Sequence, residues 1–277
     1  MKSLIANQKK YPPKLNILKE CRAVADLVSV PFSLLSSKFG KPQENATLPI
    51  LMFPGFGTDD RYLKPMANYL RNLGWKTEGW GLGRNLAGLN LKHTLKDLSS
   101  RWEIDFPEDY SAETYRGEAG VPLLCDKAIA RVEQRSKELG SQVIIVGWSL
   151  GGYIARECAR ELPNEVAQII TLGTPIFGGP KYTSAAKLFK AKNFNLDWIE
   201  ESIERRDSNP IKQPITCVYS RSDGVVSEYA AKDTVSPNVN NIEIDAAHLG
   251  MGFNRKVWKT VKDALALEAK KRSYYSG

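Results

Sequence analysis

Short apolar runs alternate along this chain with longer stretches in which apolar residues recur at helical spacing. The runs predict strands at residues 48–53, 75–80, 143–148, 166–172, 213–219 and 241–245. The helical spacing predicts helices at residues 61–73, 121–139, 151–162 and 256–270. Because strands alternate with helices, we expect an α/β fold with a mostly parallel central sheet and helices on both of its faces.

The first segment of the chain has a different pattern. Between residues 14 and 39, basic and apolar positions alternate, and five apolar positions share one helical face: Leu15, Leu18, Val24, Leu27 and Val28. Pro31 is expected to interrupt this helix. Because Glu20 and Asp26 lie on its polar face, we expect the apolar face to pack on the core. The alternative is an amphipathic arm that touches a membrane surface.

Length and composition fit one domain. A chain of 277 residues, 42% of them hydrophobic, can bury one sizeable core. We expect residues 1–47 to form an N-terminal helical extension and residues 48–277 to form the main domain. No apolar run approaches about 18 residues, and residues 1–13 are too polar for the apolar region of a signal peptide. A soluble, cytoplasmic protein is therefore expected.

The chain is basic, with a formal net charge of +8 and a pI near 9.2. Lys and Arg concentrate at the two ends, and residues 1–41 carry eight of them against Glu20 and Asp26. We interpret them as a solvated surface, so no nucleic-acid partner is expected, and a weak membrane-surface contact through the N-terminal segment is the alternative. The four cysteines lack metal-ligand spacing, and no metal site is expected.

The clearest chemical signal follows the predicted strand at residues 143–148. Residues 147–151 read G-W-S-L-G and match G-x-S-x-G, which puts Ser149 on a tight turn between a strand and a helix. Glycines suit this turn because side chains two positions from the serine would collide. The following helix directs its N-terminus at the reaction centre and favours developing negative charge there. Ser149 is the candidate nucleophile, against the alternative of a glycine-rich turn without chemistry.

A nucleophilic serine needs a general base, and the chain has only two histidines, His93 and His248. His248 follows the last predicted strand, whereas His93 lies among leucines upstream of the serine and is interpreted as a surface residue. The base needs an acid to orient it. Asp223 follows the strand at residues 213–219 in a turn-rich loop, where its alternative role is an Asx turn. Asp245 is the rival acid, but we expect it to point away from the imidazole.

The order Ser149, Asp223, His248 resembles the α/β-hydrolase superfamily, in which the triad runs serine, acid, histidine. The resemblance covers residues 48–268. It includes W-G-L-G-R-N at residues 80–85, which is similar to a group of little-characterised bacterial lipase-like hydrolases. The resemblance implies an α/β-hydrolase fold and a serine hydrolase that cleaves carboxylic esters, either an esterase or lipase-like, without a cofactor. A small-molecule ester or a lipid is the expected substrate.

Two loops extend the resemblance. Residues 53–57, F-P-G-F-G, are similar to the family's oxyanion loop, with proline where many members have histidine. By this match, the backbone N–H groups of Phe56 and Leu150 form the oxyanion hole. Residues 172–175, L-G-T-P, are similar to the segment after the sixth strand in bacterial lipases and esterases, with Ile176 in place of their usual histidine.

The long connection at residues 176–212 is the predicted region of substrate selection. The resemblance implies a helical cap there, and apolar residues recur at near-helical spacing: Leu188, Phe189, Trp198, Ile199 and Ile203. This apolar face either covers the serine or packs on the core, and the pattern favours neither. The candidate pocket residues are Trp148, Phe177, Phe189 and Trp198.

Two other functions stay open. A serine-dependent acyltransferase would use the same residues and pass the acyl group to an alcohol or a thiol. A non-catalytic binding protein could share the fold, because this fold hosts many chemistries. The presence of all three triad residues favours the hydrolase over the binding protein.

Overall fold

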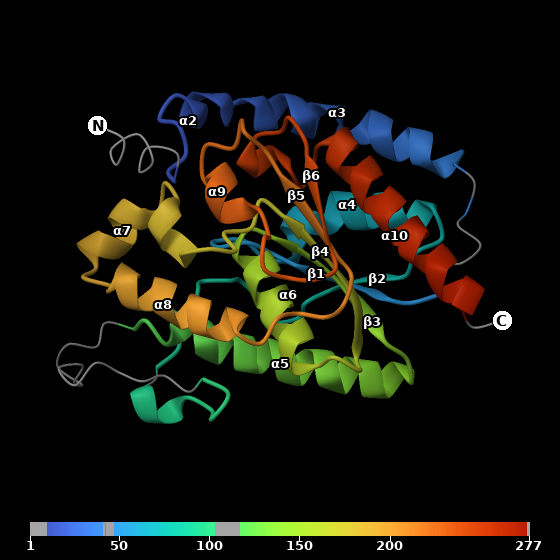
Figure 1. Ribbon diagram of the computed structural model, residues 1–277. Helices are drawn as coiled ribbons and strands as arrows, with labels where there is room; N and C mark the ends of the chain where they lie inside the picture. Colours follow the sequence, from blue (N-terminus) through green and yellow to red (C-terminus); the bar gives the residue numbers. More distant parts are fainter. Residues whose placement is uncertain (1–9, 41, 43–46, 93, 103–116, 276–277) are drawn as a thin grey trace.

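This computed structural model describes residues 10–40, 42, 47–92, 94–102 and 117–275. Within this part of the chain, parallel strands form an open six-stranded sheet in the order β2-β1-β3-β4-β5-β6 (Figure 1). Each strand overlaps a predicted one, so the predicted parallel sheet is confirmed. The strands are β1 (Ile50–Phe53), β2 (Thr77–Gly79), β3 (Val143–Trp148), β4 (Val166–Leu172), β5 (Ile215–Tyr219) and β6 (Val239–Glu243).

Helices cover both faces of the sheet, as predicted (Figure 1). One face carries α4 (Asp60–Asn72) and α10 (Arg255–Tyr275), with α3 (Arg22–Lys38) lying against both helices. The other face carries α5 (Gly120–Leu139) and α6 (Leu150–Glu161). The shorter elements are α2 (Asn16–Lys19), α7 (Ala186–Ala191), α8 (Leu196–Asp207), α9 (Glu228–Ala231) and 3₁₀ turns at Leu95–Asp97, Gly179–Tyr182 and His248–Gly250.

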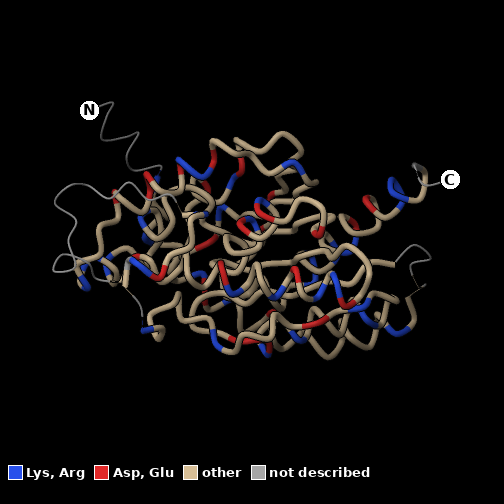
Figure 2. Tube along the Cα trace, turned by 90° about the horizontal axis from the view of Figure 1, so that it is seen from below, with Lys and Arg blue, Asp and Glu red and all other residues tan. Residues whose placement is uncertain are grey.

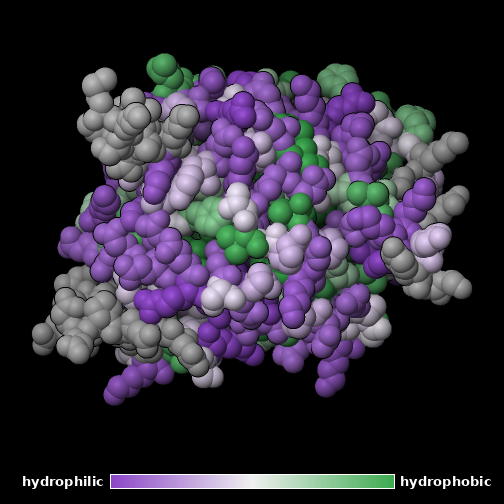
Figure 3. Space-filling view, in the orientation of Figure 1, coloured by the Kyte–Doolittle hydropathy of each residue, from purple (hydrophilic) through white to green (hydrophobic). Residues whose placement is uncertain are grey.

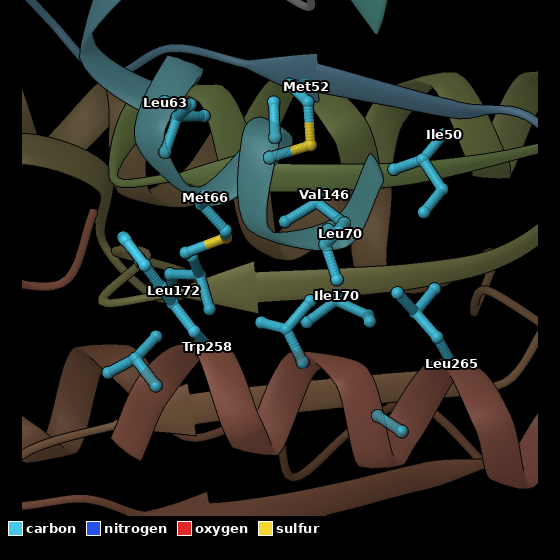
Figure 4. Packing of buried hydrophobic residues seen from close by; sticks show 14 of the residues in the cluster. Ile50, Met52, Leu63, Met66, Leu70, Val146, Ile170, Leu172, Trp258 and Leu265 are labelled. Atoms are coloured by element: carbon cyan, nitrogen blue, oxygen red, sulfur yellow. The ribbon is translucent and has the colours of Figure 1, made fainter. Parts of the chain in front are cut away.

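Strand residues alternate between the two cores. Ile50 and Met52 of β1 pack in one cluster with residues of α4 and α10, and Figure 4 shows this packing around Leu70. Leu51 and Phe53 of the same strand pack in the other cluster, toward α5 and α6. Successive strand residues point to opposite faces, and here both faces are buried, which explains why the strands read as continuous apolar runs.

The strand order reverses between β1 and β3. From β1 the chain goes outward to β2, returns to β3 on the other side of β1, and continues to β6. Open parallel sheets bind ligands at the carboxyl ends of their strands, at the point where the order reverses. At that point Phe53 of β1 pairs with Gly147 of β3, two residues before Ser149. The fold therefore puts the predicted nucleophile at the usual location of a site.

Pro31 does not interrupt the N-terminal helix. α3 is 17 residues long and continues through Pro31, contrary to the prediction. Proline removes one helical N–H donor, here the partner of the Leu27 carbonyl. Because Pro31 and Leu27 both lie on the exposed side of α3, water can satisfy that carbonyl, and the helix tolerates the proline.

The expected packing of the apolar face of the N-terminal segment is wrong. All five residues predicted to face the core are exposed by 50% or more: Leu15, Leu18, Val24, Leu27 and Val28. Green atoms lie along the upper edge of Figure 3, where Figure 1 shows α2 and α3. The buried side of the segment carries polar residues, among them Asn16, Glu20, Ser33 and Ser37, beside the partly buried Val30 and Leu34, which pack on the core. Hydrogen bonds of Asn16, Glu20 and Ser37 with the rest of the protein orient the helix, as described below.

Candidate active site

β3 passes directly into α6 at Ser149, which is the N-cap of that helix. The serine has φ 54° and ψ −126°, a positive φ that costs a non-glycine residue about 1–3 kcal/mol. Two neighbouring positions accept only glycine. A Cβ on Gly147 would lie 2.5 Å from the carbonyl oxygen of Gly151, and one on Gly151 would lie 2.3 Å from that of Phe53. The predicted turn is present, and the N-terminus of α6 is directed at Ser149.

His248 lies between Ser149 and Asp223 in a continuous chain of hydrogen bonds. Its Nε2 is 3.1 Å from Oγ of Ser149, and its Nδ1 is 2.8 Å from Oδ2 of Asp223. His248 and Asp223 are both 2% exposed, so little water competes for these contacts. The three residues follow β3, β5 and β6, and parallel strands bring their carboxyl ends to the same edge of the sheet. This arrangement allows a base to take the serine proton while a carboxylate orients the base.

Asp223 makes the contacts expected for both of the roles considered for it. Its Oδ1 accepts hydrogen bonds from the backbone N–H groups of Val225 and Val226, both at 2.7 Å, which makes the Asx turn. Its Oδ2 faces Nδ1 of His248. Because the turn occupies one carboxylate oxygen, the other is held in one position toward the imidazole.

The rival acid is engaged elsewhere. Arg22 of α3 donates two hydrogen bonds to the carboxylate of Asp245, at 3.0 and 3.1 Å. The hydrogen bond from Arg22 lowers the pKa of Asp245 to about 2. Asp245 therefore fixes the N-terminal helix to the end of β6 and contacts Arg22 instead of the imidazole. His93, the other histidine, lies outside the described residues.

Glu20, at the C-terminal end of α2, was not predicted to contribute to the site. Its Oε1 accepts hydrogen bonds from the backbone N–H groups of Gly224 at 2.8 Å and His248 at 3.0 Å. Its Oε2 accepts one from Leu249 at 2.8 Å. One buried carboxylate thus bridges the loop of the acid and the loop of the base. Hydrogen bonds to an ionised acceptor are among the stronger ones in proteins.

Asn16 of α2 holds the acid loop at a second point. Its Nδ2 donates to the backbone carbonyls of Arg221 at 2.7 Å and Asp223 at 3.2 Å, and the residue is 3% exposed. In the sequence, Glu20 and Asn16 each stand out only as a polar residue among apolar ones. Periodicity marks such a residue as solvent-facing, which is why its role was missed.

The two residues whose amides are predicted to form the oxyanion hole line the same cavity as Ser149. Phe56 follows β1 and Leu150 begins α6, next to the serine. Within the described residues, neither backbone N–H group has a hydrogen-bond partner. Two unpaired N–H donors beside a nucleophile can bind an oxygen that becomes negatively charged.

Asn85 holds the loop that carries Phe56. Its Nδ2 donates to the carbonyl of Pro54 at 2.8 Å, and its Oδ1 accepts from the N–H of Ala87 at 3.1 Å. Its backbone carbonyl accepts from the N–H of Gly57 at 2.7 Å. Asn85 is fully buried. Sequence reasoning gave it no role, although it ends the motif at residues 80–85.

Trp148 contacts the backbone of the candidate base, His248. Its Nε1 donates to the carbonyl of His248 at 3.1 Å, and its ring stacks on Tyr62 with centroids 3.9 Å apart. The Tyr62 hydroxyl donates to the carbonyl of Leu249 at 2.9 Å. Burial raises the pKa of Tyr62, so this phenol stays protonated and keeps donating. Both ring residues therefore hold the turn that carries His248.

A cavity of about 840 Å³ opens beside Ser149 and His248. Three of the four predicted pocket residues line it: Trp148, Phe189 and Trp198. Phe177 is not among the described residues that line it, and its ring lies 6.3 Å from that of Tyr229. A further cluster of apolar wall residues was not predicted: Val121, Tyr153, Phe194, Leu249. A volume of this size accommodates a drug-sized or acyl ligand.

The connection between β4 and β5 forms one wall of this cavity. α8 contributes Trp198, Ile199 and Ile203, and α7 contributes Phe189. The Phe189 ring lies 6.3 Å from that of Phe56 on the predicted oxyanion loop. The apolar face of this connection therefore faces the cavity, although Trp198 and Ile203 are also buried among neighbours.

A network of charged residues ties α8 to α6. Arg160 of α6 contacts Asp207 of α8 at 2.9 Å, and Arg206 of α8 contacts Glu157 and Glu161 of α6 at 2.6 and 2.7 Å. Burial raises the pKa of Asp207. Buried charges are tolerated only when they are paired, so separating α8 from α6 would leave several of them uncompensated.

The described residues offer two further observations. They contain no group of three or more His, Cys, Asp or Glu side chains arranged to hold a metal ion. None of the helices they form is long and apolar enough to cross a membrane.

Comparisons with solved structures show the fold. The chain superposes on a metagenome-derived lipolytic enzyme of the LipS and LipT pair with a TM-score of 0.53 and 14% identity, over 83% of this chain and 96% of that one. It superposes on a Bacillus licheniformis lipase with a TM-score of 0.51 and 14% identity, over 81% and 94%. Identities this low speak to the fold alone, and the predicted α/β-hydrolase fold is confirmed.

Sequence comparisons identify relatives. A pimeloyl-[acyl-carrier protein] methyl ester esterase of Aliivibrio salmonicida is 32% identical over 117 residues, which cover 40% of this chain and 43% of that protein. The chain thus spans less than half the length of the curated relatives it matches. A family model described as PGAP1-like alpha/beta domain matches residues 45–266 and leaves α2 and α3 outside. Since this match covers most of the chain, the chain belongs to the PGAP1-like alpha/beta domain family.

Proposed function

We propose that this protein is a carboxylic ester hydrolase that works through an acyl-enzyme on Ser149. The observation that carries the proposal is the chain of hydrogen bonds from Ser149 through His248 to Asp223, at the edge of a largely apolar cavity. The relative from Aliivibrio is named as a methyl ester esterase, and the two superposed proteins are lipolytic enzymes, which supports the same class of reaction.

The proposed reaction begins when Oγ of Ser149 attacks the carbonyl carbon of the ester. His248 takes the serine proton on Nε2, and Asp223 holds the ring and stabilises the imidazolium. The tetrahedral intermediate collapses, His248 gives its proton to the leaving alcohol, and the acyl group stays on the serine. Water, deprotonated by His248, then attacks the acyl-enzyme and releases the acid and the free serine.

The N–H groups of Phe56 and Leu150 are the proposed donors to the oxyanion. Their unpaired state and their position beside the cavity support this role. Each preorganised donor of this kind typically contributes about 2.7–4 kcal/mol to stabilising the transition state. The N-terminus of α6, which begins at Leu150, adds a favourable dipole.

We also propose the domain arrangement expected from the sequence. Residues 176–212 act as a cap over the cavity, and the apolar residues that α7 and α8 direct into it support this role. Residues 1–47 are an extension added to the hydrolase domain at residues 48–277, in line with the family match that begins at residue 45. An apolar cavity of about 840 Å³ favours an ester with a medium or long acyl chain over an acetate.

A panel of p-nitrophenyl esters and a fluorophosphonate probe test this proposal. The wild type should hydrolyse the esters and react with the probe, whereas Ser149→Ala should lose both by at least about a thousandfold. Ser184→Ala, at an exposed serine outside the cavity wall, is the matched control and should behave like the wild type. Alanine has the same backbone cost as serine at this φ, so the fold should persist.

The same measurements separate the two alternatives. Probe labelling with acyl transfer to an added alcohol or thiol, and little release of acid, would identify an acyltransferase. Failure of the wild type to react with the probe or with any ester would reject both enzymes and favour a binding protein.

A further inference from the structure

The outer face of the N-terminal segment is apolar and accessible. Four residues of α3 lie within an arc of about 80° when successive residues are placed 100° apart: Val24, Val28, Phe32 and Leu35, which are 64, 68, 75 and 57% exposed. Phe39, directly after the helix, is 83% exposed. Leu15 at the N-cap of α2 and Ile17 and Leu18 within α2 are exposed as well. We call this set of eight residues the outer apolar face. So many exposed apolar side chains on one short segment indicate an interaction surface.

The orientation of this segment is fixed by its other side. Ser37 of α3 accepts a hydrogen bond from Asn72 of α4 at 2.8 Å, and Asp26 accepts one from Asn254 at 2.9 Å. Glu20 accepts three backbone hydrogen bonds from the loops of the candidate active site. Rotating the helix to bury its apolar residues would break these contacts and leave buried amides unpaired. The exposed apolar residues are therefore a stable feature of the fold.

The charges of the segment separate by sign. Lys14, Lys19 and Lys38 are exposed, whereas the two acids of the segment are turned inward: Glu20 is 8% exposed and Asp26 is partly buried against Asn254. The accessible charges that this segment contributes are consequently basic, and the exposed carboxylate beside it, that of Asp245, is paired with Arg22. The opposite side of the molecule differs, because in Figure 2, which views it from below, Lys and Arg positions are interspersed with Asp and Glu positions.

We propose that the outer apolar face, with its flanking lysines, docks this protein on an anionic lipid surface. A helix that lies in the membrane interface buries an apolar face among acyl chains and places basic side chains at the headgroups. The exposed lysines complement anionic headgroups. A second copy of the chain fits less well, because pairing two such faces would bring lysines against lysines.

The segment that would dock contacts the wall of the cavity through its inner side. Leu249 is 46% exposed and lines the cavity, and its N–H group donates to Glu20 at the end of α2. The proposal concerns binding and holds whether or not the cavity performs ester hydrolysis, so each can fail without the other.

Co-sedimentation with lipid vesicles tests the proposal on the full chain. The wild type should bind phosphatidylcholine vesicles that contain phosphatidylglycerol, should bind pure phosphatidylcholine weakly, and should be released by high salt. Phe32→Asp and Lys19→Glu should each lower binding by roughly tenfold. The matched controls are Leu139→Asp and Lys137→Glu, at exposed positions of α5 on the opposite side of the sheet, and these should bind like the wild type.

The variants change exposed side chains, so their far-ultraviolet circular dichroism and melting temperature should match those of the wild type. Absence of binding to anionic vesicles, or equal binding by Phe32→Asp and the wild type, would overturn the proposal. A wild type that ignores vesicles but doubles its mass in solution, with Phe32→Asp monomeric, would replace the lipid by a second copy of the chain.

Discussion

The backbone N–H of His248 donates a hydrogen bond of 3.0 Å to the carboxylate of Glu20, a residue 228 positions earlier in the sequence. The same carboxylate accepts from Gly224, directly after Asp223. One side chain thus binds both the loop of the candidate acid and the loop of the candidate base, and this side chain lies outside the family match at residues 45–266. We therefore expect the site to depend on a segment that the family match does not include.

Glu20→Gln should therefore impair catalysis as well as stability. The amide keeps one acceptor but turns its NH₂ group toward one of three backbone donors. Losing a hydrogen bond to a charged group costs about 1.5–3 kcal/mol, so we expect kcat to fall by about tenfold or more. KM should change little, because Glu20 is not among the residues that line the cavity.

Steady-state kinetics on one p-nitrophenyl ester check this, with Glu133→Gln on the exposed side of α5 as the control. A lower melting temperature with unchanged kcat would mean that Glu20 stabilises the fold without positioning the site.

The proposed acid, Asp223, can be tested by two matched substitutions. Asp223→Asn should lower kcat by about a thousandfold or more, because an amide no longer holds the imidazole in the required tautomer. Asp245→Asn should lower it by less than about threefold, since its partner is Arg22. Both are measured under saturating ester. The reverse ranking would transfer the acid role to Asp245.

Asn85 should matter for the oxyanion loop. Asn85→Ala removes the bonds to Pro54 and Ala87 in a fully buried place, and we expect both a lower melting temperature and a lower kcat, with about 1–3 kcal/mol lost from stability. Asn85→Asp keeps the acceptor to Ala87 but sets a buried carboxyl oxygen against the carbonyl of Pro54, so it should perturb the loop at least as much as Asn85→Ala. Wild-type kcat in both variants would mean that Asn85 does not determine the position of Phe56.

The cap is tested by two adjacent residues of α7. Phe189 lines the cavity, whereas Leu188 is 48% exposed and is not among the lining residues. Phe189→Glu should reduce kcat/KM for octanoate much more than for acetate, because each buried methylene of the substrate contributes about 0.8 kcal/mol. Leu188→Glu should leave the ratio of the two esters unchanged. Equal losses on both esters for Phe189→Glu, with a lower melting temperature, would assign this residue to the core.

The ion pair of Arg22 and Asp245 predicts a dependence of stability on pH. Arg22 lowers the pKa of Asp245 to about 2, below the ordinary value of about 3.9. The pair therefore contributes stability at pH values above about 4, and this contribution is lost as the pH falls toward 2. Thermal unfolding of the wild type and of Asp245→Asn should differ by a small, constant amount near neutral pH. The difference should shrink as the pH falls from about 4 to about 2, and a difference that stays constant over this range would contradict the prediction.

The strands and main helices could be predicted from the sequence because their patterns report burial directly. Strands that are buried on both faces, such as β3, read as unbroken apolar runs. The order of Ser149, Asp223 and His248 along the chain, combined with parallel strands, was enough to expect them at one edge of the sheet. Local sequence carried this information.

The N-terminal segment was predicted with its faces reversed for a physical reason. Periodicity shows that one side of a helix is apolar, but not which side meets the protein. Here Glu20 and Asn16 find buried backbone partners more than 200 residues away, and those contacts set the orientation. Asn85 was missed for the same reason, because its partners on the oxyanion loop are distant in sequence.

The charged contacts between α6 and α8 make the two helices of the proposed cap unequal. α8 is joined to the helix of the nucleophile by Arg160 and Arg206, whereas α7 rests in a small apolar cluster with Phe194. Withdrawing α7 exposes a few apolar atoms to water, but withdrawing α8 separates buried charges. We therefore expect a substrate too bulky for this cavity to displace α7 while α8 stays in place.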